Sequence, residues 1–89
     1  MDTKELKKIT EQFSVEQLEA CIQQQLAKGE NACNVIDSTN NVIEALSKAG
    51  VIREIMNQGL TFSEALRELG RRIRAVYGQD TEDQKNGSP

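Results

Sequence analysis

Apolar residues recur at three- and four-residue intervals along most of this chain, which is the spacing that places them on one side of an α-helix. The stretches with this spacing are 3–12, 15–28, 39–58 and 62–77. Gly50 lies inside the third stretch, where it either ends a helix at 39–50 before a second one at 51–58 or sits within one longer helix. The pattern therefore predicts four or five helices.

Residues typical of helix ends separate these stretches. Asp2 is a suitable N-cap for the first one. The segments Ser14–Gln17 and Thr61–Glu64 match the capping box, in which two side chains satisfy unpaired backbone N–H groups at the helix start. Gly29 and Gly78 follow the second and last stretches, where a residue with positive φ commonly ends a helix. The helix boundaries are thus marked locally.

Two regions fall outside the helical pattern. In the polar connection 29–37, Val35 and Ile36 are expected to reach the core, whereas residues 79–89 contain no aliphatic or aromatic side chain. Such a segment buries too little apolar surface to offset the entropy of ordering it, so we expect a disordered tail. Residues 1–78 are expected to form one all-α domain, a compact bundle of four to five short helices with the last helix as its spine.

The composition narrows the class of protein. The chain has 89 residues, which suits a single domain. No window approaches the roughly 18 consecutive apolar residues of a membrane span. The start, Met1 to Glu5, lacks the apolar region of a secretory signal. The sequence therefore favours a cytoplasmic protein that does not contact membranes.

The residues available for chemistry argue against an enzyme. The chain has no histidine, so it lacks the commonest general base, and the usual Cys/His zinc sets cannot be assembled. Ser14, Ser38 and Ser63 lie at expected helix starts, where capping explains them. We expect no catalytic activity, no cofactor and no bound metal.

Arginines gather in the last helical stretch. Residues 62–77 carry four arginines and two glutamates, a net charge of +2. Because the whole chain has a net charge of −3, the remaining residues sum to −5. At about 100° per residue, Arg67, Arg71 and Arg74 lie opposite the apolar side of this helix. This row would suit an acidic protein partner. Its plainer explanation is a solvated surface with Glu–Arg pairs one turn apart.

Nucleic acid is an alternative ligand for the same helix. Residues 51–77 contain two helical stretches joined by a short turn at Gly59, as in a helix–turn–helix. However, the net charge is negative, whereas DNA-binding domains are typically basic. Any antiparallel helix pair gives the same pattern, so a protein partner is the preferred interpretation.

Apolar residues at the ends of the last two helical stretches are further candidates for partner binding. Met56 is an adaptable side chain, and Tyr77 combines an apolar ring with a polar tip. Ordinary core closure explains both residues equally well. Small helical domains often gain burial by self-association, so we expect a homo-oligomer, with a homodimer as its simplest form.

Two cysteines complete the list of candidates. Cys21 lies on the second helical stretch and Cys33 in the connection after it, so the loop could bring them within disulfide range. Two reduced structural thiols are the favoured interpretation in a reducing cytoplasm. A disulfide or redox pair and a metal site shared between subunits are the alternatives.

Overall fold

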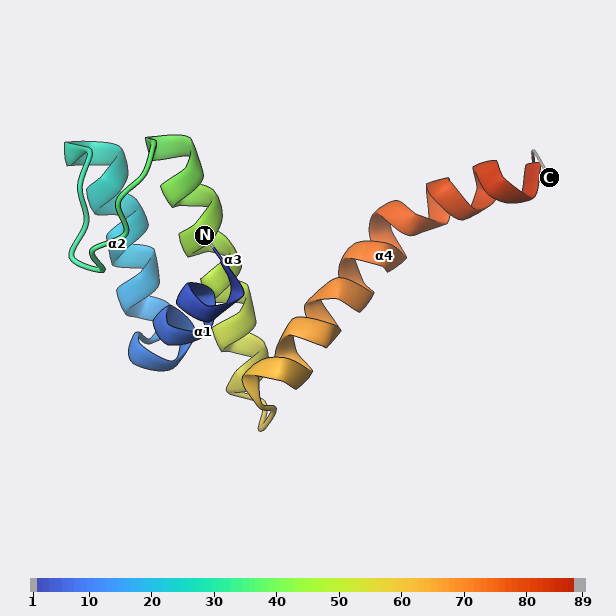
Figure 1. The fold of residues 1–89 in the computed structure, drawn as a ribbon, viewed down its shortest axis with the longest axis horizontal. Helices are drawn as coiled ribbons and strands as arrows, with labels where there is room; N and C mark the ends of the chain where they lie inside the picture. The colour runs from blue at the N-terminus through green and yellow to red at the C-terminus, as the bar shows by residue number, and fades with distance from the viewer. Residues whose placement is uncertain (1, 88–89) are drawn as a thin grey trace.

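Four helices make up most of the chain (Figure 1). The computed structural model describes residues 2–87, with side chains described for 2–76. The helices are α1 (Thr3–Gln12), α2 (Val15–Lys28), α3 (Thr39–Met56) and α4 (Phe62–Gly87), and residues 2–87 contain no strand. The prediction of an all-α bundle with four to five helices is confirmed.

The helix starts use the caps that the sequence predicts. The Ser14 hydroxyl accepts the Gln17 backbone N–H at 3.2 Å, while the Gln17 side chain accepts the Ser14 N–H at 2.8 Å. Thr61 and Glu64 exchange the same two hydrogen bonds at the start of α4, at 3.2 and 2.9 Å. Ser38 caps α3. The Asp2 carboxylate accepts the Glu5 backbone N–H at 2.8 Å at the start of α1. All four helix starts are therefore fixed by side chains within the first turn.

The glycines divide into helix ends and one interior position. Gly29 ends α2 with φ +75°, and Gly59 lies in the turn before α4 with φ +103°, both in the left-handed region that favours glycine. Gly50, by contrast, lies inside α3, which passes it without a break. The stretch 39–58 therefore forms one helix and not two.

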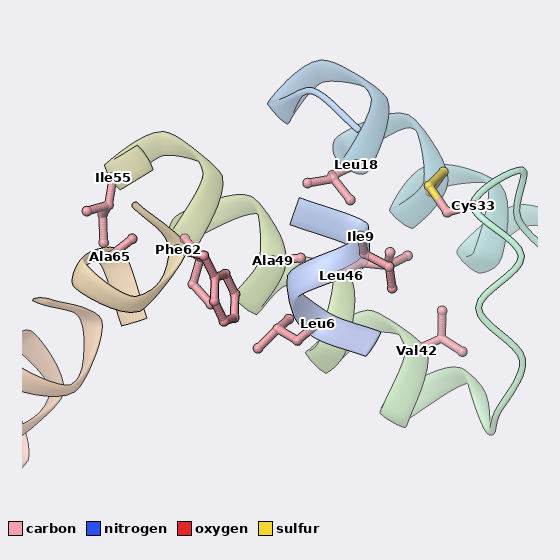
Figure 2. Close-up of a cluster of buried hydrophobic side chains, with 12 residues drawn as sticks. Leu6, Ile9, Leu18, Cys33, Val42, Leu46, Ala49, Ile55, Phe62 and Ala65 are labelled. Atoms are coloured by element: carbon pink, nitrogen blue, oxygen red, sulfur yellow. A yellow bond between two sulfur atoms is a disulfide. The ribbon is translucent and has the colours of Figure 1, made fainter. Parts of the chain in front are cut away.

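The core is centred on α3, which packs against α1, α2 and α4. Its fully buried residues are Val42, Leu46, Ala49, Ile52 and Ile55. Figure 2 shows Leu6 and Ile9 of α1, Leu18 of α2, and Phe62 and Ala65 of α4 lying around this helix. The expectation that the last helix is the spine is wrong, because α3 is the helix that the others cover.

Arg53 ties α3 to the end of α1. Its Nη1 donates to the backbone carbonyl of Thr10 at 2.8 Å, and Thr10 is itself fully buried. This carbonyl belongs to the last turn of α1, where backbone acceptors lack helical partners and a positive charge is favourable. A partly buried charge-assisted hydrogen bond therefore holds the first helix to the central one.

The C-terminal helix leaves the three-helix body. α4 contacts α3 and α1, makes no contact with α2, and extends away from them (Figure 1). The sequence predicts its end at Gly78, whereas the helix continues to Gly87. The sequence predicts a disordered tail over 79–89, of which the backbone of 79–87 is helical and residues 88 and 89 lie outside the described residues. None of the helices over 2–87 is both long and apolar enough to cross a membrane.

Candidate functional site

The protruding part of α4 has an uncovered apolar side. Leu66 and Leu69 are half-buried and pack against the core, whereas the side chain of Ile73 is 46% exposed and that of Val76 is 66% exposed. The spacing of these residues alternates between three and four, as in the apolar seam of a coiled coil. We call residues 69–76 the α4 arm. Its seam starts in the core and continues into solvent.

The predicted arginine row lies on the outer side of this helix. Arg67, Arg71 and Arg74 are all exposed. Arg72 is also exposed, and it lies closer to the apolar seam than the other three, at roughly 80° from its centre on a helical wheel. The helix therefore presents guanidinium groups on its outer face and beside its apolar stripe.

Glu68 binds two of these arginines. Arg71 donates from Nε and Nη2 to the two Glu68 oxygens at 2.8 and 2.6 Å, and Arg72 donates from Nε at 2.8 Å. These hydrogen bonds, from Arg71 first and then Arg72, lower the pKa of Glu68 to about 2. Exposed pairs one turn apart stabilise a helix only weakly, so either arginine can exchange Glu68 for another carboxylate.

Of the two apolar candidates from the sequence, Met56 lies among the residues whose side chains the structure describes, and Tyr77 does not. Met56 is half-buried and packs against the core at the end of α3, so its environment fits core closure. The side chain of Tyr77 lies outside the described residues, so its proposed role stays untested. The large apolar side chains of α4 that are exposed within the described part are Ile73 and Val76.

Cys21 and Cys33 are joined in a disulfide, with their Cα atoms 6.2 Å apart. Both residues are buried at the edge of the core, where Figure 2 shows the bond linking α2 to the following connection. The favoured interpretation of two reduced thiols is therefore corrected, although the reach of the loop was predicted. Among the described residues, no group of three His, Cys, Asp or Glu side chains is placed to hold a metal ion.

The connection between α2 and α3 is held from both ends. The buried Gln25 amide donates to the Thr39 hydroxyl at 3.0 Å and accepts from the Asn31 amide at 2.9 Å. Val35 is half-buried against the core, as expected, but Ile36 is 94% exposed. The prediction that both residues reach the core is wrong for Ile36, because the backbone turns it outward.

A cavity of about 700 Å³ lies between this connection and α1. Its lining includes the exposed acidic residues Asp2, Glu5 and Asp37 beside Lys8. The Asp37 pKa is lowered by the backbone N–H of Ser38 and by the Asn41 amide, so this carboxylate stays ionised and accepts hydrogen bonds at the start of α3. The cavity thus presents solvated charges at the surface.

A second hollow lies between α2 and α3, and its lining residues come from these two helices alone. This α2–α3 groove measures about 180 Å³, and its apolar lining includes Val15, Ile22 and the 41% exposed Val51. Two carboxylates, Glu19 of α2 and Glu54 of α3, also line it. The sequence pattern did not reveal this groove, because helical spacing places apolar residues on one side of a helix without showing which of them a neighbouring helix covers.

Gly50 is part of the same groove. A Cβ atom added there would meet nothing within 4 Å, so no neighbour in the folded chain requires a glycine. Glycine inside a helix costs about 1 kcal/mol relative to alanine. A missing side chain at this position deepens the groove and exposes the backbone of α3 to whatever approaches it.

Comparisons with protein-family models, with curated proteins and with solved structures found no match to this chain.

Proposed function

We propose that this protein is a non-enzymatic protein–protein interaction module that self-associates through α4. The observation that carries the proposal is the exposure of Ile73 and Val76 on a helix that extends away from its own core. An apolar stripe on a protruding amphipathic helix gains stability when a second surface covers it. The basic row Arg67, Arg71 and Arg74 would then meet acidic groups of the partner.

The charge distribution supports an acidic protein surface as the counterpart. The total charge is −3, whereas residues 62–77 alone carry +2. A second copy of the chain therefore offers a negatively charged body to the positive helix. Opposite charges of this kind accelerate association and fix orientation more than they raise affinity.

Self-association is tested by measuring mass against concentration. Sedimentation equilibrium of the full chain should show a reversible increase in mass for the natural sequence. The double variant Ile73→Asp, Val76→Asp should stay monomeric at the same concentrations, with an unchanged helical circular dichroism spectrum, because both side chains are exposed in the single chain. A wild-type protein that stays monomeric throughout would overturn the proposal.

The role of the arginine row is tested by the triple variant Arg67→Glu, Arg71→Glu, Arg74→Glu. We expect it to lose association with little loss of stability, because all three side chains are exposed. The alternative ligand, duplex DNA, is tested in the same series. DNA binding that weakens with salt at a log–log slope of about −3 would favour a phosphate-binding surface over a protein one.

A cytoplasmic location remains part of the proposal. In that compartment reducing systems keep most thiols unpaired, so the Cys21–Cys33 disulfide would form only on oxidation. Rapid alkylation of cell lysate followed by mass measurement tests this point. Two alkyl groups on each chain would agree with a reducing cytoplasm, and none would place the protein in an oxidising compartment.

A further inference from the structure

We propose that the α4 arm of one copy occupies the α2–α3 groove of a second copy. The inference rests on the proposed self-association and adds the surface that receives the arm. The groove has a partly exposed apolar floor that α4 of the same chain does not touch. The arm has an exposed apolar stripe that no other part of the described chain covers. The arm could cover the apolar residues of the groove, and the groove could cover the apolar stripe of the arm.

The charges of the two surfaces match in position as well as in sign. Glu19 and Glu54 line the groove from its two different helices. On the arm, Arg72 and Arg74 lie on opposite sides of the apolar stripe, at roughly 80° and 120° from its centre. With Ile73 and Val76 on the groove floor, one guanidinium faces each wall. Arg72 would then exchange Glu68 for a carboxylate of the second copy.

Gly50 gives a separate reason to expect a helix in this groove. Nothing in the single chain lies within 4 Å of an added Cβ at this position, so internal packing does not account for the glycine. A missing side chain allows the backbone of another helix to approach closely. The apolar and acidic residues that surround Gly50 are those that would contact the arm.

The contact joins two different surfaces, which determines the form of the assembly. One such contact alone would allow copies to add indefinitely, whereas a pair of copies that exchange their arms forms a closed dimer with two equal contacts. Exchange is favoured because two copies then cover both arms and both grooves, whereas an open row leaves one arm and one groove uncovered at its ends. The expected assembly is an arm-exchanged dimer.

Charge reversal tests the location of the contact. The variant Glu19→Arg, Glu54→Arg should raise the dissociation constant of self-association by about tenfold or more, because guanidinium groups would then face each other. The matched control is Glu11→Arg, Glu44→Arg, which changes the total charge equally at exposed positions that do not line the groove. This control should associate as the wild type does.

Combining the groove change with Arg72→Glu and Arg74→Glu should restore association. The fourfold variant has the same net charge as the natural chain, so a gain over the two double variants would come from pairing and not from total charge. Gly50→Leu should block the groove and weaken association while leaving the monomer folded.

The outcomes separate this inference from the proposed function. One outcome would refute the groove as the binding site while supporting self-association through α4. In it, association is unchanged by Glu19→Arg, Glu54→Arg and by Gly50→Leu, but is lost on Ile73→Asp, Val76→Asp. Arms that pair with each other would give that result. A monomeric wild type would refute both.

Discussion

Reduction of the Cys21–Cys33 disulfide is expected to lower the stability of the fold substantially. The bond spans a sequence separation of 12 and encloses the second half of α2 and the turn at Gly29. In the loop-entropy model, a crosslink of this length restricts the unfolded chain enough to stabilise the native state by about 3 kcal/mol. Because small domains are stable by only about 5–15 kcal/mol in total, this is a large fraction.

The effect should appear in urea unfolding followed by far-UV circular dichroism. For a domain whose free energy of unfolding falls by about 1–3 kcal/mol per molar urea, the loss corresponds to a midpoint about 1–3 M lower in the reduced protein. The slope should also increase on reduction, because the unfolded chain without its crosslink exposes more surface.

The double variant Cys21→Ala, Cys33→Ala serves as the control. Its midpoint should be the same with and without reductant, which separates loss of the bond from other effects of the reducing agent. Equal midpoints for the oxidised and reduced natural chain would refute the reasoning. That result would mean that the unfolded chain is already restricted in this region, or that other contacts replace the bond.

Four further substitutions have expected outcomes that follow from a single side-chain contact or a single backbone conformation. Arg53→Met removes the hydrogen bond to the buried Thr10 carbonyl and should cost about 1–3 kcal/mol in denaturant unfolding, whereas an unchanged midpoint would show that water replaces it. Gly29→Ala should lower the free energy of unfolding by about 1–2 kcal/mol, because Gly29 has a positive φ. Gly50→Ala, measured on dilute monomer, should raise it by about 1 kcal/mol, because Gly50 lies inside a helix with open space beside it. Equal effects of the two substitutions would contradict the assigned conformations. The Glu68 carboxyl should titrate near pH 2 by NMR. Because its folded pKa lies below the unfolded value of about 4.3, its stabilising contribution is complete above that value and is lost as the pH falls toward 2, and Glu68→Gln should remove this pH dependence.

Features set within one helical turn were predictable from the sequence. The capping boxes at Ser14 and Thr61 and the end of α2 at Gly29 each involve residues three or four positions apart, so a short pattern specifies them. The exposure of Arg67, Arg71 and Arg74 also followed, because helical spacing alone relates these residues to the apolar stripe.

Features that depend on how the helices pack were not predictable. Apolar character suggested a buried Ile36, but the direction of that side chain depends on how Asn31 and the disulfide hold the connection. Likewise, the heptad spacing of α4 does not reveal that Ile73 lies beyond the last residue of the core that could cover it. The α2–α3 groove forms between two helices, so the sequence of either helix alone does not predict it. Its one sign in the sequence was Gly50, a glycine inside a helical stretch.

The placement of α3 inside the other helices has a consequence for local unfolding. Its buried residues contact α1, α2 and α4, whereas α1 contributes only Leu6, Ile9 and Thr10 to the interior. α1 can therefore detach while α2 and α3 remain paired. Amide protons in the middle of α3 should exchange with solvent only when the whole fold opens, which costs the most free energy. Those of α1 should exchange through a separate local opening that costs less free energy. The protein would then lose its structure in steps, beginning at its N-terminus.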